Sequence, residues 1–176
     1  MAKLVYQTYG DALFQLAVEE NKVDELFSET KAMKEIFEEN EELLKLLTNP
    51  KIDKQEKLNI VENIFSGRAS KDLVGFLKVI ITKDRQRYVI GIFDYFIAAA
   101  KEYKKIGVVY VTTAIPLDDI GREKVVKKLL ETTKYEELEM NYSVDAEIIG
   151  GMIIRIGDRV VDSTIRTKIT KLSKQL

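Results

Sequence analysis

The residues whose types and spacing could best support a chemical reaction lie near the C-terminus, in the segment Gly150–Arg166, GGMIIRIGDRVVDSTIR. Its glycines suggest a phosphate-binding loop, and Asp158 and Asp162 suggest a general acid and a general base. The first idea fails because the chain has no G-x-x-x-x-G-K-[ST] or G-x-G-x-x-G motif, and because a strand pattern follows the glycine pair. Ion pairing with the nearby Arg155 and Arg159, together with helix capping, explains the aspartates better than catalysis does.

The composition restricts the possible chemistry further. The 176 residues include neither Cys nor His, which removes disulfides, thiol catalysis, Cys-ligated zinc and the commonest general base. A histidine-free enzyme that uses carboxylates or a Ser–Lys pair stays open, although Ser163 and Lys168 are poorly spaced for one helix face. We predict no catalytic residue, no cofactor and no metal site.

Hydropathy and charge indicate an intracellular globular protein. Apolar residues make up 45% of the chain and charged residues 32%. No apolar run approaches the ~20 residues that span a bilayer, and the N-terminus lacks the apolar core of a signal peptide. The net charge is −1, but segment 19–42 is strongly acidic and segment 150–176 is basic. This asymmetry suits two different partners, although solvated helix faces explain it more simply.

The first part of the chain has a helical apolar period throughout, from Leu4 to about Lys105. It predicts six helices joined by short turns, and therefore a six-helix bundle over residues 1–106. Most of the apolar stripes are expected to form the core. The first helix has small residues beside its stripe and the fifth, which opens at Ser70, is very apolar. These two helices are also the candidates for a groove that accepts a foreign helix.

At Gly107 the apolar period changes from helical to alternating, which predicts a small α+β domain over residues 107–176 with about four strands and two helices. Gly157-Asp158 is expected to close a hairpin with a type I′ or II′ turn. Asp162-Ser163 then offers N-cap oxygens to a closing helix. The expected elements are strand 107–115, helix 118–133, strand 138–144, hairpin strands 152–156 and 159–161, and a final helix with Ile165, Ile169 and Leu172 on one face.

Two motifs resemble those of one protein family. Residues 9–17, YGDALFQLA, are similar to the Y-A-x-A-L-F-x-L-A signature that opens the delta subunit of F-type ATP synthases. Residues 150–172 resemble that family's G-G-x-x-I-R-x-G-D-x-V-I-D-x-S-I-R-x-R-L-x-x-L signature. The mitochondrial relative is the oligomycin-sensitivity-conferring protein. Among the small departures, Gly10 replaces the usual Ala and weakens the first helix by up to ~1 kcal/mol.

The resemblance implies a non-catalytic peripheral-stalk, or stator, subunit of a proton- or sodium-driven F-type ATP synthase. It implies one monomeric copy per complex at the cytoplasmic face of a bacterial plasma membrane, without membrane insertion. The helical half would bind the N-terminal helix of an alpha subunit, and the α+β half would bind the C-terminal helices of the b subunits. The protein would thereby resist the torque of the rotor.

The resemblance also implies which residues meet each partner. The alpha-helix groove would comprise Tyr9, Ala12, Leu13, Leu16, Leu73, Phe76, Leu77 and Ile80. The structural or b-subunit side would comprise Gly150, Gly151, Ile154, Gly157, Asp158, Arg159, Val161, Asp162 and Arg166. We expect Leu13→Glu or Phe76→Glu to abolish alpha binding while the domain stays folded.

The main alternative is an RNA-associated or transcription adaptor built on a helical bundle. The acidic helical half disfavours it, and the basic C-terminal residues lack the interleaved aromatic side chains of a base-stacking surface. We therefore predict no nucleic-acid partner.

Overall fold

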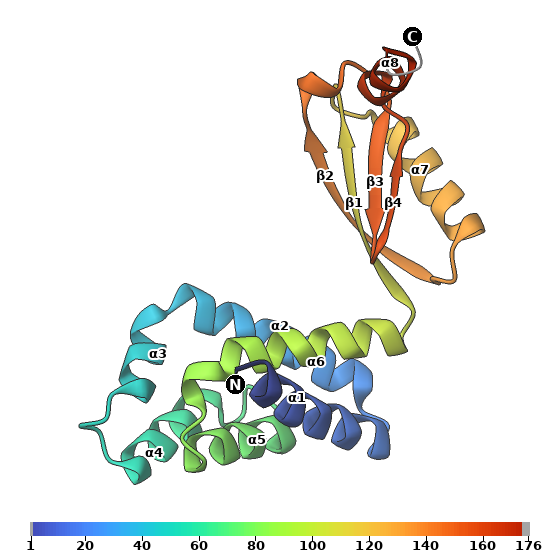
Figure 1. Ribbon diagram of the computed structural model, residues 1–176. Coiled ribbons are helices and arrows are strands. Elements are labelled where there is room, and N and C mark those ends of the chain that lie inside the picture. The colour runs from blue at the N-terminus through green and yellow to red at the C-terminus, as the bar shows by residue number, and fades with distance from the viewer. Residues whose placement is uncertain (1, 174–176) are drawn as a thin grey trace. The chain divides into compact units, whose positions relative to one another are not determined.

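The computed structural model describes residues 2–173, and its contacts divide the chain into two compact units, residues 1–100 and 101–176 (Figure 1). The division falls after Ala100, ahead of the expected boundary at Ile106. The last residues of the sixth helix therefore belong to the second unit. The predicted fold class, a helical part followed by a small α+β part, is confirmed.

The helical part contains six α-helices and a short 3-10 helix in its described residues. Two of the helices begin at residues whose side chains cap them. Asp53 accepts a hydrogen bond from the backbone N–H of Gln55 at 3.0 Å, and Ser70 accepts one from that of Leu73 at 3.3 Å. The helices are α1 (Ala2–Glu19), α2 (Val23–Glu39), α3 (Glu41–Thr48), α4 (Lys54–Phe65), α5 (Lys71–Thr82), η1 (Gln86–Tyr88) and α6 (Val89–Tyr103).

Phenylalanines occupy the centre of the first unit. The ring centroid of Phe37 lies 5.9 Å from that of Phe65 and 6.2 Å from that of Phe93, which joins α2, α4 and α6. Such aromatic pairs add stability beyond the apolar area that they bury. Helix α6 buries one apolar face, with Val89, Ile92, Phe93, Phe96 and Ala100 in the core.

Helices α1 and α6 approach closely because a glycine of each meets a tyrosine of the other. A Cβ atom on Gly10 would lie 2.3 Å from the Tyr95 ring, and one on Gly91 would lie 2.5 Å from the Tyr6 ring. The Tyr95 hydroxyl donates to Asp11 at 3.0 Å, and this hydrogen bond raises the pKa of Tyr95. Gly10 is therefore a packing requirement in this chain, which its helix propensity alone does not reveal.

The second unit contains a four-stranded sheet in the order β2-β1-β3-β4. Strand β1 pairs in parallel with β2 through a crossover that contains α7, and it pairs antiparallel with β3. Val109 and Val111 of β1 pack with Val125 and Leu129 of α7 and with Ile156 of β3 to form a separate core. The elements are β1 (Ile106–Thr113), α7 (Asp119–Thr132), β2 (Glu137–Val144), η2 (Ala146–Ile148), β3 (Met152–Ile156), β4 (Arg159–Asp162) and α8 (Ile165–Ser173).

The predicted hairpin is present between β3 and β4. Ile156 pairs with Arg159 across the two-residue loop. In the loop, the φ of Gly157 is +55°, whereas the φ of Asp158 is not positive. This combination is that of a type II′ turn, in which glycine occupies the first central position. None of the helices within residues 2–173 is long and apolar enough to cross a membrane.

Candidate protein-interaction surfaces

The residues predicted for the alpha-helix groove fall into a buried group and a surface group. The buried group is at most 2% exposed and holds the helices of the first unit together. It comprises Leu13, Leu73, Leu77 and Ile80. The surface group is half-buried or exposed and is accessible to a partner. It comprises Tyr9, Ala12, Leu16 and Phe76.

This division corrects one expectation about variants. Leu13 is fully buried, so Leu13→Glu would place a charge in the core and destabilise the whole unit. The expected loss of binding without unfolding therefore applies to Phe76→Glu, because the Phe76 side chain is only half-buried.

Sequence reasoning missed two further residues on the outer face of α5. Val79 is 49% exposed, one turn from Gly75, and a Cβ atom on Gly75 would meet nothing within 4 Å. A glycine inside a helix costs about 1 kcal/mol relative to alanine, and internal packing does not require this one. That cost is the signal in the sequence that could have singled out Gly75.

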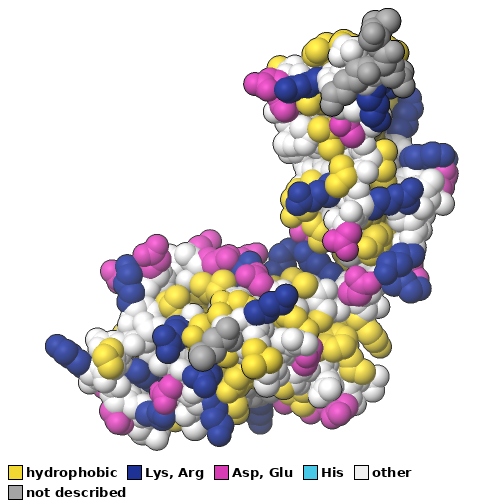
Figure 2. All heavy atoms as spheres, viewed as in Figure 1, with side chains coloured by type: hydrophobic (Ala, Val, Ile, Leu, Met, Phe, Trp, Pro, Cys, Tyr) yellow, Lys and Arg dark blue, Asp and Glu magenta, His cyan; other side chains and the backbone are white. Residues whose placement is uncertain are grey.

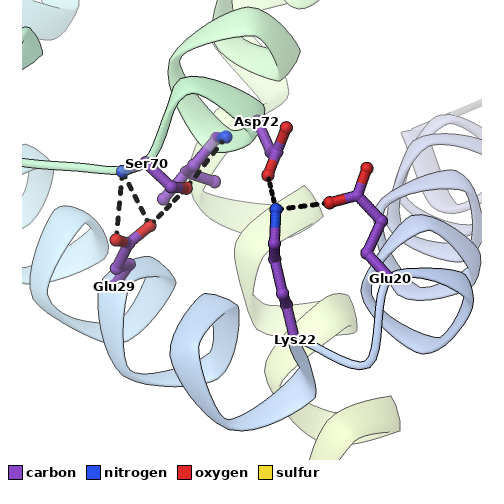
Figure 3. A network of polar contacts seen from close by, with 6 residues as sticks. Glu20, Lys22, Glu29, Ser70 and Asp72 are labelled. Carbon is purple, nitrogen blue, oxygen red and sulfur yellow. Dashed lines mark hydrogen bonds and ion pairs between the residues drawn. The ribbon is translucent and has the colours of Figure 1, made fainter.

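A polar network fixes the start of α5 against the beginning and middle of α2 (Figure 3). The Glu29 carboxylate accepts hydrogen bonds from the backbone N–H of Ser70 at 3.0 Å and from its hydroxyl at 2.6 Å. Lys22 donates to both Glu20 and Asp72, the latter at 2.7 Å. The hydrogen bond with Lys22 lowers the pKa of Asp72, and those with Asp72 and Glu20 raise the pKa of Lys22. The network positions the surface residues of α5 relative to α1 and α2.

The start of α8 differs from the prediction. Thr164, and not Ser163, is the capping residue, since its hydroxyl accepts the backbone N–H of Thr167 at 3.2 Å. The Ser163 hydroxyl donates instead to the carbonyl of Met152 at 2.9 Å, which ties the end of the hairpin to the start of β3. Asp162 accepts the backbone N–H of Thr164 at 2.9 Å, and this bond is the main cause of its lowered pKa.

Most residues predicted for the b-subunit side lie at the surface. Ile154 is half-buried against the second core, and Gly150 is half-buried below the side chain of Ile165. The exposed members are Gly151, Gly157, Asp158, Arg159, Val161, Asp162 and Arg166. Arg166 pairs with Glu147 at 3.3 Å.

The ion pairs expected within this segment are absent. Among residues 2–173, no salt bridge joins Asp158 or Asp162 to Arg155 or Arg159, and the Arg155 guanidinium lies 5.9 Å from the centre of the Tyr110 ring. Asp162 has a structural role as a hydrogen-bond acceptor at the start of α8.

Helix α8 leaves its apolar face uncovered. Ile165, Ile169 and Leu172 are 44%, 53% and 62% exposed, and no residue of α8 is buried. Figure 2 shows hydrophobic and basic side chains interspersed on the surface of this unit. The charged residues of α8 are Arg166, Lys168 and Lys171, so the helix is basic and amphipathic. The sequence pattern predicted the apolar stripe on this helix. It did not predict that the stripe stays exposed within the described residues 2–173.

The fold and these two surfaces define a class of protein. Each unit has its own core, and each exposes apolar helix residues that its own packing does not use. Within residues 2–173 no group of Asp and Glu side chains is arranged to hold a metal ion. The chain is an α+β protein of two separately packed units, each of which leaves apolar helix residues exposed.

Comparison with known proteins identifies the family. The profile of the ATP synthase delta (OSCP) subunit family matches residues 5–176. ATP synthase subunit delta of Lachnoclostridium phytofermentans is 56% identical over 176 residues, covering 100% of this chain and 97% of the relative. That of Desulfitobacterium hafniense strain DSM 10664 / DCB-2 is 34% identical, covering 98% and 96%. The chain belongs to the ATP synthase delta (OSCP) subunit family.

A solved structure agrees with this assignment at the level of the fold. A chain in the cryo-EM structure of the Toxoplasma gondii mitochondrial ATP synthase hexamer superposes with a TM-score of 0.75, covering 97% of this chain and 96% of that one at 16% identity. The predicted family is confirmed, and with it the class of ATP synthase peripheral-stalk subunits. None of these comparisons supports the RNA-associated alternative.

Proposed function

We propose that this chain is a non-catalytic link between two partners of an F-type ATP synthase. The first unit binds the N-terminal helix of an alpha subunit, and the second unit binds the C-terminal helices of the b subunits. The chain thereby holds the catalytic head against the torque of the rotor, at the cytoplasmic face of a bacterial plasma membrane. The observation that carries the proposal is the pair of separate apolar surfaces, one on each independently packed unit.

The alpha-subunit helix lies along the outer faces of α1 and α5. Small residues at Ala12 and Gly75 allow the backbone of a foreign helix to approach, and Phe76 and Val79 supply apolar contacts beside them. Such a surface suits an amphipathic helix with apolar residues at spacings of three and four. The Glu29–Ser70 hydrogen bonds support this role, because they hold the start of α5 in place without a partner.

The b-subunit helices cover the apolar face of α8. Burial of an exposed Ile or Leu side chain contributes about 1.5–3 kcal/mol, so three such residues supply a useful share of a protein–protein affinity. Arg166, Lys168 and Lys171 flank this face, and α8 contains no acidic residue. The basic flank favours a partner helix whose apolar residues are bordered by Asp or Glu.

A pair of matched variants in the full chain tests this arrangement. Val79→Glu should weaken binding of an alpha N-terminal peptide by tenfold or more and leave capture of a b C-terminal segment unchanged. Ile169→Glu should show the opposite pattern. Both side chains are exposed, so both variants should keep the native circular dichroism and unfolding midpoint. If either variant lost both partners while folded, or lost neither, the assignment of one partner to each unit would be wrong.

A further inference from the structure

Ile149, in the loop before β3, has a backbone conformation that isoleucine rarely adopts. Its φ and ψ are +67° and −40°. The backbone N–H of Gly150 donates to the carbonyl of Ile148 at 2.8 Å, so Ile149 is the central residue of a γ-turn with positive φ, the rare and strained kind. The other non-glycine residues of positive φ within residues 2–173 are not β-branched: Asn21, Asp84 and Lys105. A β-branched residue in this conformation strains the backbone.

The packing of the second unit does not require isoleucine at this position. Ile149 is 62% exposed, whereas Ile148 before it is 4% exposed and anchors the loop. The turn is held by its backbone, because the N–H of Ile149 donates to the carbonyl of Ala146 at 3.1 Å and the carbonyl of Gly150 accepts the N–H of Ile165 at 3.0 Å. Glycine would adopt the same turn without steric strain. The fold thus holds an apolar side chain at the surface at a cost in stability, which indicates a role in contact with another molecule.

Ile149 extends the apolar face of α8. A Cβ atom on Gly150 would lie 2.8 Å from Cδ1 of Ile165, so the Ile165 side chain lies against the residue that follows Ile149. Helix α8 itself lies at the end of the sheet where β1 and β2 finish (Figure 1). The exposed apolar surface at this end, here called the α8 patch, comprises Ile149, Ile165, Ile169 and Leu172.

The charges beside the α8 patch favour one kind of partner. Lys168 follows Ile165 by three positions and precedes Leu172 by four, so it borders the apolar face of the helix. Arg166 is already paired with Glu147 at 3.3 Å, which makes Lys168 the cation that we expect to meet the partner. Because α8 contains no acidic residue, the complementary surface is an amphipathic helix whose apolar residues are bordered by Asp or Glu.

We propose that Ile149 is a specificity-determining contact of the second unit, which binds an acidic-flanked C-terminal helix of a b subunit seated on the α8 patch. The partner covers the side chain that the strained turn keeps exposed, so the stability lost in the free chain is exchanged for affinity. This inference rests on the proposed function, which names the b subunit as the partner of the second unit. It adds a residue that lies outside the motif of residues 150–172.

The test uses Ile149→Gly in the full chain, which removes the side chain and relieves the strain together. Calorimetry should show that affinity for a b C-terminal segment falls about tenfold or more, while affinity for an alpha N-terminal peptide stays unchanged. Val160→Ala is the binding control, because Val160 is 57% exposed but lies beside the hairpin loop, and it should leave b affinity unchanged.

A second readout separates strain from the mere loss of an apolar side chain. Ile115 is a 72% exposed loop residue of the same unit without positive φ, so Ile115→Gly is the matched control for stability. The thermal unfolding midpoint of the second unit should be higher in Ile149→Gly than in Ile115→Gly by about 4 °C or more, because only the first substitution relieves strain.

Several outcomes would overturn the proposal. Equal midpoints in the two glycine variants would show that Ile149 is not strained. Unchanged b affinity in Ile149→Gly would remove its role in binding and leave the proposed function intact, whereas a native chain that does not bind the b segment would refute both. Binding to phosphatidylserine vesicles or self-association in ultracentrifugation that is lost in Ile149→Gly would also overturn it, because a membrane or a second copy would then cover the α8 patch.

Discussion

Replacement of Gly10 by alanine adds one methyl group to α1 at the point where the ring of Tyr95 packs on the glycine. The added Cβ atom would lie 2.3 Å from Cδ1 of Tyr95 and 3.1 Å from Cγ. Since both atoms belong to a rigid ring, the ring must move or α1 must shift away from α6. Movement of the ring also strains the 3.0 Å hydrogen bond from the Tyr95 hydroxyl to Asp11. We expect Gly10→Ala to destabilise the first unit.

The expected magnitude comes from opposing contributions. Alanine favours the helix by about 1 kcal/mol relative to glycine. Overpacking of a close contact typically costs about 1–3 kcal/mol, and loss of the hydrogen bond costs about 0.5–1.5 kcal/mol more. The net loss in the free energy of unfolding should therefore be roughly 0.5–3.5 kcal/mol, opposite in sign to the change that helix propensity alone predicts.

A double-mutant cycle with Tyr95→Ala measures the contact itself. Urea denaturation, followed by circular dichroism, should show that Gly10→Ala destabilises the native background but stabilises the Tyr95→Ala background. Gly75→Ala is the matched control, because its Cβ atom would meet nothing within 4 Å and should stabilise α5 by about 0.5–1 kcal/mol. Stabilisation by Gly10→Ala in the native background, or the same effect in both backgrounds, would refute the reasoning.

Three further predictions concern a glycine with positive φ, the cap of α8 and the ion pair between Lys22 and Asp72. Gly151→Ala should destabilise the second unit by about 2 kcal/mol or more, because φ is +81° and the new Cβ atom would lie 2.5 Å from the carbonyl oxygen of Ser163; chemical denaturation measures this. Thr164→Ala should cost about 1 kcal/mol and lower amide protection in α8, whereas Ser163→Ala should leave that protection unchanged. Asp72→Asn should lower the midpoint of urea denaturation at neutral pH, and its difference from the native chain should vanish as the pH falls below 3.8. The sign follows because the folded-state pKa of Asp72 is lowered, so its contribution is present above the unfolded pKa and is lost in acid.

Each of these predictions has an outcome that contradicts it. Normal stability of Gly151→Ala would mean that the backbone at this glycine relaxes without cost. If Ser163→Ala lowered the amide protection of α8 and Thr164→Ala left it unchanged, Ser163 would be the capping residue, as the sequence predicted. A difference between Asp72→Asn and the native chain that persisted in strong acid would show that the variant acts through something other than the Lys22 ion pair. Lys22→Met is the partner control, and it should reproduce the neutral-pH loss.

Local patterns were sufficient for most of the fold. The helical stripes mark the buried face of each helix because apolar residues at spacings of three and four must lie on one side, and the residues that α6 buries follow this spacing. The Gly157-Asp158 hairpin follows from turn geometry, which depends on only two residues and their flanking strands. The sheet order is a tertiary property that no local pattern specified.

Features that depend on distant residues were beyond a single sequence. Thr164, Ser163 and Asp162 are all good capping residues, and only the position of β3 decides that Ser163 binds Met152 instead. The stripe on α8 looks like a core face, but only the packed structure shows that it is exposed. Leu13 belongs to the motif that resembles the family's signature, yet it is fully buried, so it is a core residue of the first unit and is not accessible to a partner.

The central claim is that two surfaces on one chain hold two partners at the same time. The most direct measurement is native mass spectrometry or analytical ultracentrifugation of the full chain with an alpha N-terminal peptide and a b C-terminal segment. We predict a complex that contains all three components, with the affinity for each partner unchanged by saturation with the other. Displacement of one partner by the other would contradict the claim, because it would place both on a single surface.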